Sequence, residues 1–307
     1  MKPGIYEITS EAYHANPEGI TFLSASMINI LLNESPLHAW YKHPVLNPPD
    51  VDEGEEEEDT KEAKFDVGIA SHSLVLEGVD SIVELDFKDW RKNAAKEARH
   101  LARLAGKTPL LTKQAKAVRQ MAKAAHEAVA LCPELCGVTM ADGKPEQTLI
   151  WQDEETGVWC KGRVDWLHDD HKLMIDFKST DGSAEPRAAT RRVMDQMQAY
   201  IQAAWYRRGL KAITGSDADF IFLCQESRTP FACSFINTTN AYLAMGESKI
   251  SVALPLWKKC LDSGIWPGYG GRIYQPEVRP WVQNEWLERL NEEMENAETT
   301  DKEASKE

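Results

Sequence analysis

The stretch that decides the fold is WCKGRVDWLHDDHKLMIDFKST, which spans residues 159–180. Its alternating apolar and polar residues predict two strands joined by a turn at residues 168–172. Antiparallel pairing across this turn places Asp165 opposite Asp176 or the residue before it. Asp176 and Lys178 are two residues apart on one strand, so both point to the same face of the sheet. The hairpin therefore gathers two carboxylates and one ammonium group.

This grouping suits the hydrolysis of a phosphodiester bond. Carboxylate oxygens hold Mg²⁺ or Mn²⁺, and the ion polarises the phosphate and lowers the pKa of a bound water. The ammonium group of Lys178 can orient that water or stabilise the charged transition state. The D…DxK pattern is short, however, and an ordinary hairpin with a solvent-facing aspartate and a surface salt bridge would show it as well.

The chain around the hairpin predicts an α/β (α+β) fold in which a central mixed β-sheet is flanked by helices. Helical periodicity dominates before the hairpin, and further strands and helices follow it. The expected helices cover 24–43, 65–76, 88–128 with an interruption near 106–109, 188–208 ending at Gly209, 239–262 and 281–307. The expected strands cover 147–152, 158–167, 173–177, 220–225 and 231–236.

Charge alone does not decide the function. A net charge of -14 is unusual for a protein that meets DNA, but bound metal ions reverse the local sign at a carboxylate-rich site. Much of the acid lies in residues 50–59, where it predicts a solvated, disordered loop, and in the tail 285–307. Residues 88–128 are strongly basic, so a helix face there either contacts phosphate or pairs with the acidic segments.

The sequence contains no signal for export or membrane insertion. No apolar run approaches the roughly 20 residues that span a bilayer. Residues 1–7, MKPGIYE, carry an early acid and lack the apolar segment of a signal peptide. We therefore expect a cytoplasmic protein without a membrane partner. The six cysteines have no CxxC framework, so free thiols are expected rather than disulfides.

Several ordered elements make the pattern more specific than the hairpin alone. They are the helix with SMIN and PLHAWY between residues 26 and 41, FDVGIASH at 65–72 with a G-x-x-x-H spacing, the hairpin itself, and YIQAAWY at 200–206 with a Q-x-x-x-Y spacing. Glu146 stands at an acidic position just ahead of the strand TLIW. With these elements, the chain resembles the PD-(D/E)XK nuclease superfamily, and within it the RecE (exonuclease VIII) type of phage and prophage exonuclease, from about Ser24 to Trp266.

The resemblance implies a restriction-endonuclease-like nuclease core at residues 61–270 and a bacterial or phage-infected cell as the setting. An N-terminal helical segment with the acidic loop (1–60) would precede this core. A C-terminal helix with the acidic tail (271–307) would follow it.

The resemblance also implies roles for individual residues. Asp165 and Asp176 would ligate Mg²⁺, for which Mn²⁺ can substitute, and Lys178 would assist the attacking water. His72 and the backbone carbonyl of Phe177 would add metal contacts, although a histidine beside leucines is ordinarily a packed core residue. Three further residues would either contact the DNA or brace the site: Gln202, Tyr206 and Glu146.

The leading hypothesis is a double-strand DNA exonuclease that acts on DNA ends and leaves single-stranded tails for recombination. The resemblance implies 5′→3′ polarity, a ring-shaped homo-oligomer (tetramer or trimer) and a single-strand annealing protein as partner. A structure-specific endonuclease on the same fold is an alternative. A catalytically silent DNA-binding or assembly subunit is another, against which the intact Asp165, Asp176 and Lys178 argue. An acidic interaction protein without DNA would rest on the charge alone.

Overall fold

The computed structural model describes residues 1–48, 59–78, 81–271 and 273–304, so the predicted loop at 50–59 lies almost entirely outside the described residues. The chain forms two compact units, Met1–Gly268 and Tyr269–Glu307.

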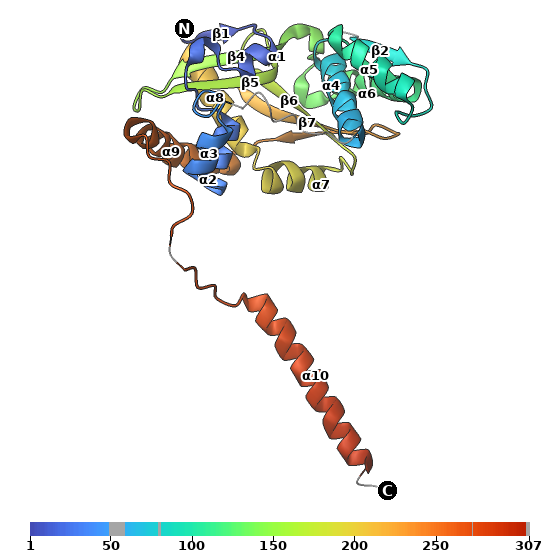
Figure 1. The fold of residues 1–307 in the computed structure, drawn as a ribbon, viewed down its shortest axis with the longest axis vertical. Coiled ribbons are helices and arrows are strands. Elements are labelled where there is room, and N and C mark those ends of the chain that lie inside the picture. The colour runs from blue at the N-terminus through green and yellow to red at the C-terminus, as the bar shows by residue number, and fades with distance from the viewer. Residues whose placement is uncertain (49–58, 79–80, 272, 305–307) are drawn as a thin grey trace. The chain divides into compact units, whose positions relative to one another are not determined.

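A six-stranded mixed sheet lies at the centre of the first unit, as expected for an α/β (α+β) fold (Figure 1). Its order is β1-β4-β5-β6-β7-β8, and neighbours are antiparallel except β6 and β7, which are parallel. The strands are β1 (Gly4–Tyr6), β4 (Gly143–Gln152), β5 (Trp159–His168), β6 (Leu173–Thr180), β7 (Asp219–Glu226) and β8 (Cys233–Asn237). A second, parallel sheet pairs β2 (Ile82–Leu85) with β3 (Thr108–Leu111). The prediction lacked β1, β2 and β3, because three or four residues are too few to show alternation.

Helices cover both faces of the central sheet. One face packs against α2 (Ala25–Asn33), α8 (Tyr200–Thr214) and α9 (Asn240–Ser263), and the other packs against α4 (Asp59–Leu76) and α6 (Thr112–Leu131). The remaining short helices are α1 (Ser10–His14), η1 (Pro17–Gly19), α3 (Pro36–Lys42), α5 (Asn93–Leu104), η2 (Pro133–Leu135), η3 (Met140–Asp142), α7 (Pro186–Thr190) and the π-helical η4 (Arg191–Gln196). Figure 1 shows α4, α5 and α6 at one end of the sheet, and α2, α3 and α9 at the other.

The single helix expected at 24–43 is in fact two helices, α2 and α3. The break falls at Ser35-Pro36, because proline disfavours the helical conformation in the residue before it. Both helices begin with a serine cap. The hydroxyl of Ser24 accepts from Met27 N at 3.4 Å, and that of Ser35 accepts from His38 N at 3.3 Å.

The helix expected at 188–208 is also wrong in its bounds, since α7, η4 and α8 occupy this region and α8 continues to Thr214. The helix ends at Gly215, which has a φ of 76°. Gly209 lies inside α8 for a different reason. A Cβ atom at Gly209 would lie 2.6 Å from the ring of Trp151, so the missing side chain lets the helix approach β4. Trp151 and Trp205 pack there with ring centroids 4.8 Å apart.

A buried ion pair fastens α4 to α5. The carboxylate of Asp66 accepts two hydrogen bonds from the guanidinium of Arg99, at 2.9 and 2.8 Å, and two from that of Arg103, at 3.3 and 2.9 Å. The side chains of Asp66 and Arg99 are only 5% and 4% exposed. Arg99 also lies 4.8 Å from the ring centroid of Trp90. These contacts fix α4, the helix that carries His72.

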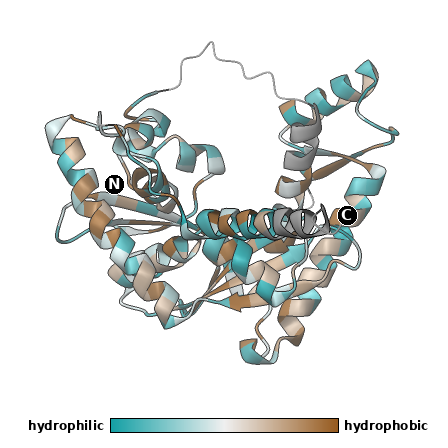
Figure 2. Ribbon diagram, turned by 90° about the horizontal axis from the view of Figure 1, so that it is seen from below, coloured by the Kyte–Doolittle hydropathy of each residue, from teal (hydrophilic) through white to brown (hydrophobic). Residues whose placement is uncertain are grey.

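The second unit contains α10 (Pro280–Ala304), and Figure 2 shows hydrophobic and hydrophilic residues alternating along it. Among the residues that the structure describes, no helix is long and apolar enough to cross a membrane. All six cysteines are free thiols, as the sequence predicts.

We expect Asp66→Asn to lower the free energy of unfolding by about 3–5 kcal/mol, because it removes the buried carboxylate that compensates the charge of Arg99. Denaturant titration of the full chain measures this loss. The matched control is Asp89→Asn, which removes a carboxylate from the exposed Asp89–Arg91 pair and should leave the unfolding midpoint essentially unchanged. Equal effects of the two substitutions would contradict the role given to Asp66.

Candidate active site

The two strands of the hairpin separate at the candidate site. In the described chain, β5 and β6 share the pairs Trp166↔Ile175 and Leu167↔Met174 and no others. The next positions in this register are Asp165 and Asp176, which confirms the predicted placement. At the position where the next backbone hydrogen bond between the two strands would form, Phe177 N donates instead to Asp165 Oδ2, at 2.9 Å. The carboxylate thus replaces a backbone acceptor and is fixed in the opening between the strands.

Asp176, Lys178 and Gln202 form a closed network on the α8 side of the sheet. The Asp176 side chain is 1% exposed and pairs with the ammonium group of Lys178. Gln202 donates to Asp176 Oδ2 at 2.5 Å and accepts from Lys178 Nζ at 3.4 Å. Gln202, predicted either to contact DNA or to brace the site, therefore contacts both charged groups of the hairpin.

His72 on α4 connects two carboxylates from neighbouring strands. Its Nε2 lies 3.2 Å from Asp165 Oδ2, and its Nδ1 lies 3.0 Å from Glu146 Oε1. The ring is also edge-on to Phe177, with centroids 6.3 Å apart. The structure thus brings His72 to the hairpin, where its two nitrogens contact acids instead of being packed only among leucines.

Glu146 has an unusual backbone conformation for its residue type. Its φ is 54°, a left-handed value that costs energy for a residue with a side chain and often marks a functional position. In the β4–β5 register Glu146 falls between the pairs Pro145↔Trp166 and Gln147↔Val164, opposite Asp165. Its second carboxylate oxygen pairs with Arg163 Nε. The sequence reasoning missed Arg163, although it stands two residues before Asp165.

Tyr206 is held behind the network by a close approach to β5. A Cβ atom at Gly162 would lie 2.7 Å from the Tyr206 ring, so only glycine leaves room for the ring there. The Tyr206 hydroxyl interacts with the Gln202 side chain and the Arg163 backbone. Burial, together with the nearby carboxylates, raises the pKa of this hydroxyl. These contacts favour bracing over DNA contact for Tyr206.

The carboxylates of the site differ in their protonation behaviour. Burial and the charge of Asp165 raise the pKa of Asp176 to about 6. Burial acts in the same direction on Asp165, but the hydrogen bond and charge of His72 outweigh it, so the pKa of Asp165 is lowered. Burial would lower the pKa of His72, but the hydrogen bonds to Asp165 and Glu146 raise it to about 10. His72 and Lys178 therefore neutralise the carboxylates.

The donor set fits a hard divalent cation. Asp165, Asp176 and Glu146 supply carboxylate oxygens, which Mg²⁺ prefers. Both ring nitrogens of His72 face carboxylates, so the ring would have to lose a proton before one of them could bind a metal ion. Within the described part of the chain, no group of three acidic, histidine or cysteine side chains is arranged so that it could hold a metal ion. The carboxylate oxygens of Asp165 and Asp176 face His72, Lys178 and Gln202 instead. The ligand roles of these side chains and of the Phe177 carbonyl stay predictions.

A pocket of about 370 Å³ opens directly beside these groups. Asp165, Glu146, Gln202 and Tyr206 line one side of it, and residues of α1 and α2 line the other, including His14, Ser26 and Asn29. The sequence reasoning missed this N-terminal wall, because residues so distant in sequence meet only through the fold.

Lys161 holds the N-terminal wall against β5. It is 6% exposed, and its ammonium group contacts Tyr13 O and the side-chain oxygen of Asn16. It also lies 4.2 Å from the ring centroid of Tyr13. Burial lowers the pKa of Lys161 to about 8.

Ion pairing occupies much of the basic stretch at 88–128. Arg99 and Arg103 bind Asp66, and other basic residues pair in the same way: Arg91 with Asp89, Arg119 with Glu84, and Lys123 with Glu127. These partner acids lie outside both acidic segments, 50–59 and 285–307, so phosphate contact and pairing with those segments both stay predictions for this stretch.

Comparisons with known proteins agree with this architecture. The family model described as "PDDEXK-like domain of unknown function (DUF3799)" matches residues 50–275. A crystal structure from Eubacterium rectale, of a protein with a provisional exonuclease assignment, superposes with a TM-score of 0.54 at 15% identity and covers 89% of this chain and 97% of its own. At that identity the likeness concerns the fold alone.

An alkaline exonuclease from Laribacter hongkongensis has a TM-score of 0.24 at 13% identity and covers 66% of this chain and 97% of its own, a likeness too low to support an argument. The search of curated proteins found no match.

We expect Mn²⁺ or Mg²⁺ to raise the unfolding midpoint of the metal-free chain, because an ion that binds only the native state stabilises it by about 2.7 kcal/mol at a hundredfold excess over its Kd. Asp165→Asn should lose most of this rise in a thermal denaturation series. The control, Asp169→Asn, changes an exposed aspartate in the turn of the same hairpin and should keep it. An undiminished rise in Asp165→Asn would show that the ion binds elsewhere.

Proposed function

Because the chain belongs to the PDDEXK-like family DUF3799 within the PD-(D/E)XK nucleases, we propose that it is a metal-dependent exonuclease acting on the ends of double-stranded DNA. The observation that carries the proposal is the convergence of Asp165, Asp176 and Lys178 where β5 and β6 separate, beside an open pocket.

Different residues of the site would have different roles in hydrolysis. Asp165 and Asp176 would hold a divalent cation, preferably Mg²⁺, with His72 and the Phe177 carbonyl as further ligands. The chemistry that such an ion supplies when bound is activation of a water and stabilisation of charge on the phosphate. Asp176 and Gln202 fix the ammonium group of Lys178, so that it can orient the water or stabilise the developing negative charge.

The pocket beside Asp165 supports strand binding next to this centre. Hydroxyl, amide and imidazole groups of Ser26, Asn29 and His14 line its N-terminal wall, and such groups commonly contact the phosphates and sugars of DNA. A strand whose end enters there would present its phosphodiester bond to Asp165, one of the lining residues. Cleavage at an end, rather than within a duplex, is the activity that this arrangement favours.

The finer features of the proposal rest on the resemblance to RecE-type exonucleases. They are 5′→3′ polarity, a ring-shaped trimer or tetramer around the duplex, and single-stranded tails handed to an annealing protein for recombination. The Eubacterium rectale protein carries a provisional exonuclease assignment too, which is the class proposed here. Enclosure of the duplex by a ring would keep the enzyme on its substrate between successive cleavages.

Digestion of linear duplex labelled at the 5′ or the 3′ end tests the activity. We expect Mg²⁺-dependent release of mononucleotides or short products, abolished by EDTA, with the order of label release giving the polarity. Lys178→Ala should reduce the rate at least about a hundredfold, because it removes a charge placed at the developing transition state.

Two controls make this assay decisive. Lys172→Ala changes an exposed lysine at the start of the same strand region and should keep the wild-type rate. Covalently closed circular duplex should resist digestion, and its cleavage would favour the structure-specific endonuclease instead. If the wild type hydrolyses no DNA with any divalent cation, the proposal is wrong.

A further inference from the structure

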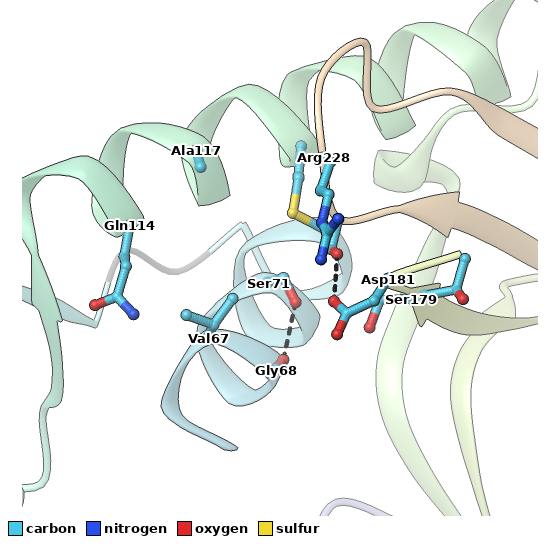
Figure 3. A pocket seen from close by; sticks show the side chains of 11 residues that line it. Val67, Gly68, Ser71, Gln114, Ala117, Ser179, Asp181 and Arg228 are labelled. Atoms are coloured by element: carbon cyan, nitrogen blue, oxygen red, sulfur yellow. Dashed lines mark hydrogen bonds between the residues drawn. The ribbon is translucent and has the colours of Figure 1, made fainter. Parts of the chain in front are cut away.

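A second pocket has a volume of about 580 Å³ and lies near the candidate centre. Its walls come from α4, α6, the end of β6 and the turn after β7 (Figure 3). Its volume falls within the roughly 300–1,000 Å³ of small-molecule sites. Neither the sequence motifs nor the activity proposed above has given it a role.

The same two elements carry the centre and this pocket. Ser179, which lines the pocket, directly follows Lys178 on β6, and Ser71 directly precedes His72 on α4. Alternate residues of a strand face opposite sides of a sheet. Lys178 therefore lies on the α8 side with Gln202, whereas Ser179 faces the pocket between the sheet and α4. A molecule bound in the pocket would lie beside Ser179, the residue that directly follows the proposed catalytic Lys178 on β6.

One wall of the pocket is suited to a nucleobase. Val67 from α4, with Ala117 and Met121 from α6, presents apolar side chains to the space. Gln114 stands at the edge of this wall, as Figure 3 shows. Its amide oxygen already accepts from Leu111 N at 3.0 Å, so the orientation of the amide is fixed. The NH₂ group remains able to donate to a base.

The opposite wall is polar and carries one cation. Figure 3 shows the guanidinium of Arg228 above Asp181. Across the described chain, the Arg228 side chain makes no hydrogen bond or ion pair. Asp181 is itself engaged, and one of its oxygens accepts from Ser227 Oγ at 2.8 Å. A guanidinium group without a hydrogen bond or ion pair among the described residues suits a phosphate.

We infer that this pocket binds one deoxynucleoside monophosphate, the unit that the neighbouring centre would release. That the ligand is produced by the neighbouring centre rests on the proposed function. Its binding is argued from the residues of the pocket alone. The base would pack on Val67, Ala117 and Met121, with Gln114 as its polar contact, and the phosphate would bind Arg228.

Calorimetric titration of the full chain with dAMP in EDTA tests the inference, because a mononucleotide is not hydrolysed and no metal contributes. We expect saturable one-site binding that weakens at least about tenfold in Arg228→Ala, since a charge-assisted hydrogen bond is lost. Gln114→Ala should weaken it as well. The matched controls, Arg187→Ala and Gln120→Ala, change exposed residues of the same types outside the pocket and should bind like the wild type.

Two further ligands, each a part of dAMP, show which of its groups the pocket binds. 2′-Deoxyadenosine should bind more weakly than dAMP and should not respond to Arg228→Ala, whereas inorganic phosphate should not respond to Gln114→Ala. The inference is overturned if dAMP does not bind, if neither pocket variant changes its affinity, or if phosphate binds as tightly as dAMP. The nuclease assay is separate, so an inactive chain that binds dAMP through Arg228 would refute only the proposed function.

Discussion

The hydrogen bond from Phe177 N to the carboxylate of Asp165 determines how the rest of the site is arranged. It occurs where β5 and β6 stop pairing, so the carboxylate satisfies a backbone donor that the opened ladder would leave unpaired. One carboxylate therefore has a fixed position at the end of the shared ladder. Asp176, opposite it in register, is turned toward α8 and is buried against Lys178 and Gln202.

Burying two carboxylates this close together requires compensation by positive charge. The structure supplies it from both sides of the sheet, with Lys178 on one and His72 of α4 on the other. The position of α4 depends in turn on the buried pair between Asp66 and Arg99. A divalent cation supplies the same compensation and attracts the same oxygens.

Local periodicity is enough to predict the hairpin but not its surroundings. The register of Asp165 and Asp176 follows from a period of two and a short turn, and the mixed sheet follows from the order of the elements. The left-handed conformation of Glu146 and the N-terminal wall held by Lys161 arise from contacts between distant segments. The helix prediction for 188–208 had the wrong bounds because the π-helical η4 and the left-handed Gln198, with a φ of 52°, separate α7 from α8.

The net charge of -14 limits how such a chain can meet DNA. Arg91, Arg99, Arg103, Arg119 and Lys123 of the basic stretch 88–128 pair with the chain's own acids, so part of its positive charge is compensated within the chain. Electrostatic attraction to DNA grows with the number of phosphates that basic residues neutralise, so each of these ion pairs weakens the attraction that the stretch offers to a duplex. The proposed action at a strand end would need fewer phosphate contacts than binding along a long duplex, because only the last nucleotides have to be held at the centre.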